Sequence, residues 1–235
     1  MNTVIYIADT STLQNPDLFN SFYHRMPSPR QKKIDRFRFE SDKKLSLGVG
    51  VLLKAACKEF GIENADEDTF VGKNGKEYLK NYPYLFFNLS HSGERAMCVF
   101  SETEVGCDVE KIDKLRWPVA ERVLSTDELS WLKKQEEAGK GETAFTRIWT
   151  LKESFLKALG FGLAAPFELT SVSVLKEGKV QAITYEGRSC SFSEPDLKDG
   201  YRYSCCMQDA APDKGIIVRQ CDFTTLQLPS KQLPA

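Results

Sequence analysis

The chain has 235 residues, of which 41% are hydrophobic and 28% are charged, and its formal net charge is −1. This composition is typical of a folded globular protein with a real core, and it excludes a disordered chain. A net charge near zero gives no overall field that would attract nucleic acid or an anionic membrane. We therefore expect neither partner, and any basic site must be local.

The length and the cysteines set further limits. We expect two compact halves rather than one large unit. The first ten residues lack a basic leader, and the apolar runs are far too short to span a membrane. Seven cysteines without a C-x-x-C pair indicate free thiols in a reducing compartment, so we expect a cytoplasmic protein. Only His24 and His91 are available as imidazole ligands, so we do not expect a zinc site.

The first part of the chain is predicted to contain one strand, three helices and a turn. Gly61 ends the third helix, and the Asn74-Gly75 pair indicates a tight turn. The expected elements are a strand at 4–8, a short helix at 16–25, a strongly basic helix at 30–38 and a long buried helix at 42–60.

The second part is predicted to combine a pair of longer helices with many strands. Glu128 follows Ser125 at the spacing of a capping box, and Gly160 ends the last helix. The expected strands are 85–89, 95–100, 105–110, 172–175, 180–184, 188–192, 201–207 and 216–219; the expected helices are 119–123, 126–137 and 145–159. A turn is expected at 90–93 and a loose tail at 229–235.

A faint internal repeat supports two similar halves. Residues 52–56 resemble 155–159, and residues 93–98 resemble 200–205. Shared helix and strand patterns explain such a likeness equally well. With the length, it predicts an α/β (α+β) fold of two halves, 1–105 and 106–228, and ligands favour the crevice between such halves.

Two carboxylates lie on the strand predicted at 105–110. Asp108 and Glu110 leave the same face of a strand, while Cys107 and Val109 point to the other. A half-exposed strand with one apolar face has the same pattern, so the pair alone does not establish a site.

A third carboxylate lies on the last long helix. Glu153 and Lys157 are one turn apart, opposite the apolar stripe that includes Leu151 and Phe155. An exposed ion pair is the structural alternative. A magnesium site would explain more specifically why three acids are present, because this hard ion prefers oxygen ligands from carboxylates and substrate phosphates.

A phosphate substrate would also need cations around it. Lys152, Lys157, His91 and the basic cluster at 30–38 could supply them. His91 lies between Ser90 and Ser92 in the predicted turn, where hydroxyl and amide groups are available to an anion. A lone histidine is ordinarily a structural residue, so at this point both interpretations remain open.

Three blocks carry a family resemblance. F-N-L-S-H-S-G at 87–93, G-C-D-V-E at 106–110 and W-T-L-K-E-S-F-L-K at 149–157 closely resemble the signature blocks of Sfp-type 4′-phosphopantetheinyl transferases. Their order and spacing extend the resemblance to nearly the whole chain.

The resemblance implies a fold and a reaction. Family members are monomeric pseudo-dimers of two similar halves, each an antiparallel-type sheet packed by a long helix, with the active site in the cleft between them. They use Mg²⁺ and coenzyme A, and they transfer 4′-phosphopantetheine to a serine of an acyl or peptidyl carrier protein. Adenosine 3′,5′-bisphosphate is released. The resemblance does not say which carrier is served: carrier proteins of fatty-acid, polyketide and nonribosomal peptide synthesis are all possible partners.

The resemblance also assigns residues by position. Glu153, Lys157 and His91 would act in catalysis, with Glu153 accepting the serine proton and Lys157 stabilising the departing phosphate. The metal ligands would be Asp108, Glu110 and Glu153. The coenzyme A contacts would be Arg30, Lys33, Lys44, Lys76, Ser90, His91, Lys152 and Lys157.

Two of these positions depart from the family pattern. Glu77 stands where the G-K-P motif of Lys76 has proline. Where many relatives have an arginine, this chain has Lys43 and Lys44; one of them, assigned here as Lys44, would replace it as a point charge rather than a planar fork.

The stretch 111–125, which contains Arg116 and Trp117, is the expected docking site for an acidic carrier, although an ordinary connecting loop would look similar. Two rival functions share the same residues: a Mg²⁺-dependent phosphodiesterase that uses water as nucleophile, and a catalytically silent protein that binds coenzyme A or the carrier.

Overall fold

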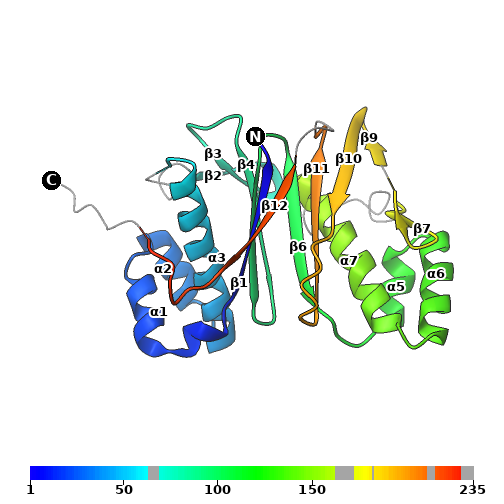
Figure 1. Ribbon diagram of the computed structural model, residues 1–235, viewed down its shortest axis with the longest axis horizontal. Coiled ribbons are helices and arrows are strands. Elements are labelled where there is room, and N and C mark those ends of the chain that lie inside the picture. The colour runs from blue at the N-terminus through cyan, green and yellow to red at the C-terminus, as the bar shows by residue number, and fades with distance from the viewer. Residues whose placement is uncertain (63–68, 162–171, 182, 211–214, 229–235) are drawn as a thin grey trace.

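The computed structural model describes residues 1–62, 69–161, 172–181, 183–210 and 215–228. Two four-stranded sheets face each other in the middle of the molecule, and each has helices on its outer face (Figure 1). The layers therefore run helix, sheet, sheet, helix. This is a mixed α/β fold in which, over the described residues, all sheet pairings but one are antiparallel.

The first sheet has the order β12-β1-β5-β4. Its strands are β1 (Thr3–Asp9), β4 (Phe86–Ser92), β5 (Arg95–Ser101) and β12 (Ile216–Cys221). Its outer face is covered by α1 (Pro16–Tyr23), α2 (Ser28–Asp35) and the long α3 (Glu40–Glu59), with a short η1 turn (Ser11–Gln14) after β1. A small hairpin of β2 (Thr69–Val71), η2 (Lys73–Gly75) and β3 (Glu77–Leu79) turns at the expected Asn74-Gly75 pair, where both residues have positive φ.

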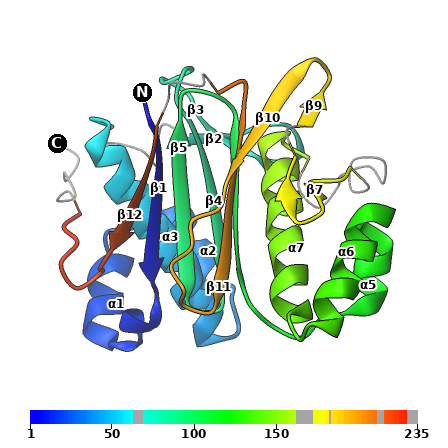
Figure 2. The ribbon, with the colours of Figure 1, turned by 45° about the vertical axis from the view of Figure 1, so that its right-hand side comes forward.

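The second sheet has the order β6-β11-β10-β9. Its strands are β6 (Val105–Lys111), β9 (Ile183–Tyr185), β10 (Arg188–Ser193) and β11 (Tyr201–Gln208). The helix α7 (Gly141–Ala158) lies on this sheet, and α5 (Trp117–Val123) and α6 (Thr126–Glu137) lie outside α7 (Figure 2). A short hairpin of β7 (Leu175–Lys176) and β8 (Lys179–Val180) completes this side.

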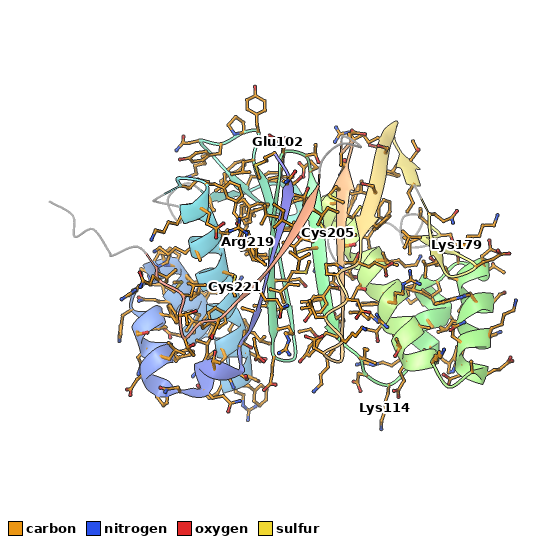
Figure 3. The ribbon with its side chains drawn as sticks, viewed as in Figure 1. Glu102, Lys114, Lys179, Cys205, Arg219 and Cys221 are labelled. Atoms are coloured by element: carbon orange, nitrogen blue, oxygen red, sulfur yellow. The ribbon has the colours of Figure 1, made fainter. Side chains whose placement is uncertain are left out.

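The two sheets share a core because successive side chains of a strand point to opposite faces, and one face of each sheet is apolar toward the other sheet. Val105, Cys107 and Val109 of β6 point between the sheets, where they join residues such as Ile5 and Met97 of the first sheet. Cys205 of β11 lies in the same layer (Figure 3). The opposite face of β6 therefore presents its acidic residues to α7.

Most predicted elements are confirmed with small shifts at their ends. The Ser125–Glu128 capping box is present, with the serine hydroxyl accepting the Glu128 N–H and the glutamate accepting the Ser125 N–H. Three predictions were wrong. Of the strand predicted at 172–175 only Leu175 lies in a strand, and the strand predicted at 180–184 is divided between β8, which ends at Val180, and β9, which begins at Ile183. Residues 90–92 are not a turn but the end of β4, and the chain reverses at Gly93, which has a φ of +57°. Ser90 and Ser92 pair with Met97 and Arg95 of β5, so their backbones are held in the sheet.

The last strand crosses back to the first sheet. β12 pairs with β1 in parallel, and Phe223 belongs to the core under α3. The boundary at 105 between two halves stays a prediction, and the expected tail at 229–235 lies outside the described residues. Among the described residues, no helix is both long enough and apolar enough to cross a membrane.

Gly106 allows α7 to approach β6 closely. A Cβ atom on Gly106 would lie 2.2 Å from the Ala158 nitrogen and 2.2 Å from the Ser154 carbonyl oxygen, both in the backbone of α7. Because both contacting atoms belong to the helix backbone, no side-chain rotation can relieve the contacts. A larger residue at position 106 would therefore push α7 away from β6.

Gly106→Ala is expected to lower the free energy of unfolding by at least about 1–3 kcal/mol, as overpacking of a rigid contact does. Urea denaturation checks this. Gly215→Ala is the control, because its new Cβ would make only ordinary contacts of 3.4 Å or more with Asn2. Equal stability of the two variants would show that α7 is not packed on Gly106 in this way.

Candidate active site

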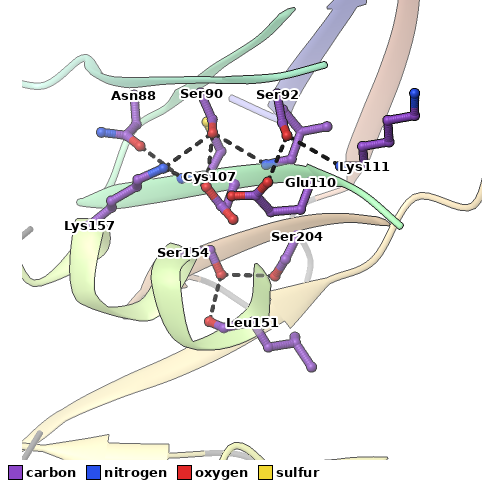
Figure 4. A network of polar contacts seen from close by, with 12 residues as sticks. Asn88, Ser90, Ser92, Cys107, Glu110, Lys111, Leu151, Ser154, Lys157 and Ser204 are labelled. Atoms are coloured by element: carbon purple, nitrogen blue, oxygen red, sulfur yellow. Dashed lines mark hydrogen bonds and ion pairs between the residues drawn. The ribbon is translucent and has the colours of Figure 1, made fainter. Parts of the chain in front are cut away.

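The two sheets meet where the edge of β4 lies beside β6. Here side chains, not backbone carbonyls, accept the N–H groups of β6 (Figure 4). Cys107 donates to Asn88 Oδ1 at 2.9 Å; Val109 donates to Ser90 Oγ at 3.3 Å, and Lys111 donates to Ser92 Oγ at 3.3 Å. We call Asn88, Ser90 and Ser92 the side-chain ladder. It satisfies alternate backbone donors of β6 and joins the two sheets.

The two serines of the side-chain ladder also hold the acids of β6. Ser90 donates to Asp108 Oδ1 at 2.9 Å, and Ser92 donates to Glu110 Oε2 at 2.6 Å. Each hydroxyl therefore accepts a backbone N–H of β6 and donates to the carboxylate of the residue before it in that strand. The predicted pairing of Asp108 and Glu110 on one face is confirmed, and that face is covered by α7.

Lys157 reaches into this site from the last turn of α7. Its Nζ lies 2.6 Å from Asp108 Oδ1 and donates to Ser90 Oγ at 3.2 Å. The structural alternative, an exposed ion pair between Lys157 and Glu153, is therefore not what α7 forms. The helix is covered on one side by β6 and on the other by α5 and α6, and Lys157 pairs with Asp108 of β6.

The three acids of the site crowd one another. Burial raises the pKa of Asp108, although Lys157 and Ser90 act against the rise. Burial and then Asp108 raise the pKa of Glu110, while hydrogen bonds from Ser92 and Trp149 lower it. Burial and then Asp108 also raise the pKa of Glu153. Lys157 behaves as their counterion: burial opposes its charge, but Asp108 outweighs burial and the pKa of Lys157 is raised.

One oxygen of this site is left without a partner. Asp108 Oδ2 is buried and accepts no hydrogen bond in the described part of the chain. A buried carboxylate oxygen without a partner, beside two further acids, fits a cation that would satisfy it. Over the described ranges, however, no three His, Cys, Asp or Glu side chains already stand in an arrangement that could hold a metal ion.

The predicted contacts for the phosphoadenosine end lie toward α2 and α3. His91 is exposed at the end of β4, and partial desolvation together with the positive charges of Lys157 and Lys33 lowers its pKa, so His91 lies within electrostatic reach of both α7 and α2. Arg30 runs over Gly50 of α3, where a Cβ atom would lie 3.4 Å from Arg30 Nε. Lys33 is exposed, and Lys44 is half-buried on α3.

Lys76 is placed differently from the other predicted contacts. It is buried and donates to Glu104 Oε2 at 2.5 Å and to the carbonyl oxygens of Val105 and Ala158, each at 3.1 Å. Burial lowers the pKa of Lys76, although Glu104 acts against this. An ammonium group has three donors, and these partners use all three. Lys76 joins β3, the start of β6 and the end of α7.

Lys152 is also directed away from the acids. Its Nζ lies 3.0 Å from Glu128 Oε2 and donates to the carbonyl oxygen of Val172 at 2.7 Å. Glu128 in turn accepts the N–H groups of Ser125 and Val174. This buried ion pair holds α6, α7 and the chain before β7 together.

Sequence reasoning did not assign roles to three residues of the site: Asn88, Ser92 and Trp149. The first two carried a readable signal, because Asn88, Ser90 and Ser92 alternate along a strand and must share one face. A pocket of about 550 Å³ begins beside Ser92 and Glu110. Its other walls include Val119, Phe145 and Trp149, with Lys111, Lys114 and Arg116 also in the lining.

Comparisons with known proteins point to one family. Residues 104–206, which contain all three acids and Lys157, match the model of the 4′-phosphopantetheinyl transferase superfamily. A 4′-phosphopantetheinyl transferase of Bacillus subtilis is 30% identical over 186 residues, covering 78% of this chain and 82% of that protein. The 4′-phosphopantetheinyl transferase Sfp of Bacillus subtilis strain 168 is 27% identical over 211 residues, covering 89% and 92%.

Among solved structures, holo-[acyl-carrier-protein] synthase of Thermotoga maritima matches with 19% identity and a TM-score of 0.31, over 46% of this chain and 64% of that one. The class of protein is that of the group-transfer enzymes in the 4′-phosphopantetheinyl transferase superfamily. Within this class, the chain belongs to the Sfp-type 4′-phosphopantetheinyl transferases.

Lys152→Ala is expected to lower the free energy of unfolding by about 3–5 kcal/mol, because it leaves Glu128 buried without its cation. Urea denaturation measures the loss, and Lys133→Ala on the exposed face of α6 is the control. The KM for coenzyme A of the folded variant should stay within about twofold of wild type. Unchanged stability with a raised KM would instead make Lys152 a coenzyme A contact.

Proposed function

We propose that the chain transfers 4′-phosphopantetheine from coenzyme A to a serine hydroxyl of an acyl or peptidyl carrier protein and releases adenosine 3′,5′-bisphosphate. The observation that carries this proposal is the acid site itself, in a chain of this family: Asp108 keeps a buried oxygen without a partner beside Glu110, Glu153 and Lys157. Anionic substrates and a divalent cation are the partners that such a site can bind.

The proposal includes the layout of the molecule. The halves 1–105 and 106–228 form a monomeric pseudo-dimer, each with a sheet backed by one long helix, α3 or α7. The active site lies where the sheets meet at β4 and β6. The return of β12 to the first sheet then acts as a strap between the halves.

Asp108, Glu110 and Glu153 would hold Mg²⁺. When bound, the metal would offset negative charge on the diphosphate of coenzyme A. The mutual crowding of the three acids favours a cation in their midst, and Lys157 supplies part of that charge already.

The proposed coenzyme A contacts form two groups, one beside the acids and one beside α2. Ser90, His91 and Lys157 would bind the diphosphate and the 3′-phosphate, while Arg30, Lys33 and Lys44 would bind the phosphoadenosine end. We leave Lys76 and Lys152 out of this set. Both ammonium groups are buried and engaged with Glu104 and Glu128, respectively.

The chemistry follows from these placements. The carrier serine oxygen forms a bond to the β-phosphorus of coenzyme A, and the bond from that phosphorus to the oxygen bridging the two phosphates breaks. Glu153, whose pKa is raised chiefly by burial, accepts the serine proton. Lys157 stabilises the charge on the departing phosphate. Positioning and electrostatics supply most of the rate in phosphoryl transfer.

The carrier would dock at 111–125. This stretch borders the pocket beside Glu110 and brings Lys111, Lys114 and Arg116 to its rim, with Lys114 directed into solvent (Figure 3). The basic rim suits an acidic carrier, and the walls formed by Val119, Phe145 and Trp149 suit an uncharged arm or an apolar contact.

One assay separates this function from its rivals. The protein is incubated with coenzyme A and Mg²⁺, with and without an apo carrier, and the products are analysed by mass spectrometry. A carrier heavier by one phosphopantetheine supports the transferase. Adenosine bisphosphate formed equally without a carrier would support a phosphodiesterase, and coenzyme A bound but unchanged would support a binding protein.

Asp108→Asn is expected to reduce carrier modification to the background rate, because the neutral amide keeps the shape but removes the charge that would bind the metal. Initial rates at several Mg²⁺ concentrations measure this. Asp127→Ala, on the exposed first turn of α6, is the control and should behave as wild type. A rate near wild type for Asp108→Asn would refute the metal assignment.

Arg116→Ala is expected to raise the KM for the carrier by roughly fivefold, since an exposed ion pair contributes up to about 1 kcal/mol. The KM for coenzyme A should not change, because Arg116 lies at the pocket rim and not at the α2 end. Steady-state kinetics with each substrate varied in turn test this. A similar rise in both KM values would argue against docking at 111–125.

A further inference from the structure

Glu110 is held by a hydroxyl group from the neighbouring sheet. From β4, the Ser92 hydroxyl donates to Glu110 Oε2 at 2.6 Å. Trp149 of α7 lines the same pocket as Glu110. Glu110 is the next-to-last residue of β6 and is only half-buried. Its orientation therefore depends on the Ser92 hydroxyl more than on packing.

The Ser92 hydroxyl is itself fixed on both sides. It accepts the N–H of Lys111 at 3.3 Å while it donates to Glu110, so its proton is directed to the carboxylate. The N–H that orients it belongs to the same strand as the acid. The N–H of Lys111 in β6 thus fixes the Ser92 hydroxyl, and this hydroxyl in turn orients the side chain of Glu110 in the same strand.

The other acid of β6 is secured in a different way. Asp108 is buried and forms an ion pair with Lys157 in addition to its bond from Ser90. Over the described ranges, Glu110 forms no ion pair. Its side chain also has one more rotatable bond than that of aspartate, so more conformational freedom must be removed to hold it.

We propose that Ser92 is a positioning residue that holds the Glu110 carboxylate in the orientation needed to bind the divalent cation. The inference rests on the function proposed above and extends it to a residue that does not itself contact substrate. Hydrogen-bond partners that orient metal-binding side chains typically contribute 10–100-fold to metal affinity, and we expect a loss of about that size when the hydroxyl is removed.

Asn88 provides a matched control within the same ladder. It accepts the N–H of Cys107 at 2.9 Å and so joins the sheets as Ser92 does. Over the described ranges, its side-chain amide forms no hydrogen bond with an acid of the site. Removing either side chain leaves one N–H of β6 without its acceptor, but only the removal of Ser92 frees a carboxylate.

The test is direct binding of Mn²⁺, as a probe for the divalent site, to the full-length protein without coenzyme A. Free Mn²⁺ is measured by electron paramagnetic resonance for wild type, Ser92→Ala, Ser92→Thr and Asn88→Ala. We expect Ser92→Ala to weaken binding by about 10–100-fold, Ser92→Thr to restore it, and Asn88→Ala to stay within about twofold of wild type. Thermal unfolding shows that each variant is folded.

Transfer kinetics give a second readout. In carrier modification, Ser92→Ala should need more Mg²⁺ for half-maximal rate and should approach the wild-type rate when Mg²⁺ is saturating. In a Glu110→Gln background, adding Ser92→Ala should change Mn²⁺ binding by less than about twofold, because its partner is already gone. If the alanine variant does not fold, Ser92→Cys keeps the volume with only a weak donor and takes its place.

Three outcomes would overturn the inference: unchanged Mn²⁺ affinity in Ser92→Ala, equal losses in Ser92→Ala and Asn88→Ala, or a further full loss in the Glu110→Gln background. Failure of the proposed function gives a different result. In that case wild type itself does not modify the carrier. If wild type modifies the carrier but binds no Mn²⁺, the metal site is wrong, and the role of Ser92 with it.

Discussion

The side-chain ladder between β4 and β6 is the contact on which the rest of the site depends. Backbone pairing would bring two strands to a fixed short spacing, with the N–H groups on the facing edge accepted by carbonyls of the neighbouring strand. Here Asn88, Ser90 and Ser92 stand in for those carbonyls, so the sheets are joined while hydroxyl groups remain to orient Asp108 and Glu110. The hydroxyl groups of Ser90 and Ser92 thus satisfy the β6 backbone as acceptors and position the acids as donors.

A second constraint keeps the charges of α7 against that ladder. Gly106 lets the helix backbone touch β6, so that Lys157 can reach both Asp108 and Ser90. Burying these charges is unfavourable unless they are paired, and within the described part of the chain Asp108 Oδ2 is a fully buried carboxylate oxygen of the site that has no hydrogen-bond partner. This oxygen lies beside the other acids, where the proposed cation would satisfy it, which links the packing of a glycine to the proposed chemistry of the site.

The spacing of apolar residues was sufficient to predict most of the elements. Many helices and strands of this chain bury one face, and the residues of that face recur at the period of a helix or a strand. This spacing failed at residues 90–92, where Ser-His-Ser resembles a turn by composition. There, pairing with β5 and acceptance of β6 N–H groups hold the chain extended. It also could not foresee that β12 returns to β1, since strand order depends on contacts between distant segments.

The lysines show why a motif alone does not define a site. Lys152 and Lys157 belong to one block of the sequence and one helix, yet they point to opposite sides of α7, to Glu128 and to Asp108. Lys76 matches a family position, but its three donors are used by Glu104 and two backbone carbonyls. A lysine whose donors are all taken stabilises the fold, whereas one that shares a carboxylate beside an unsatisfied oxygen can exchange partners when an anion binds. By this criterion Lys157, rather than Lys152, suits the catalytic role proposed above.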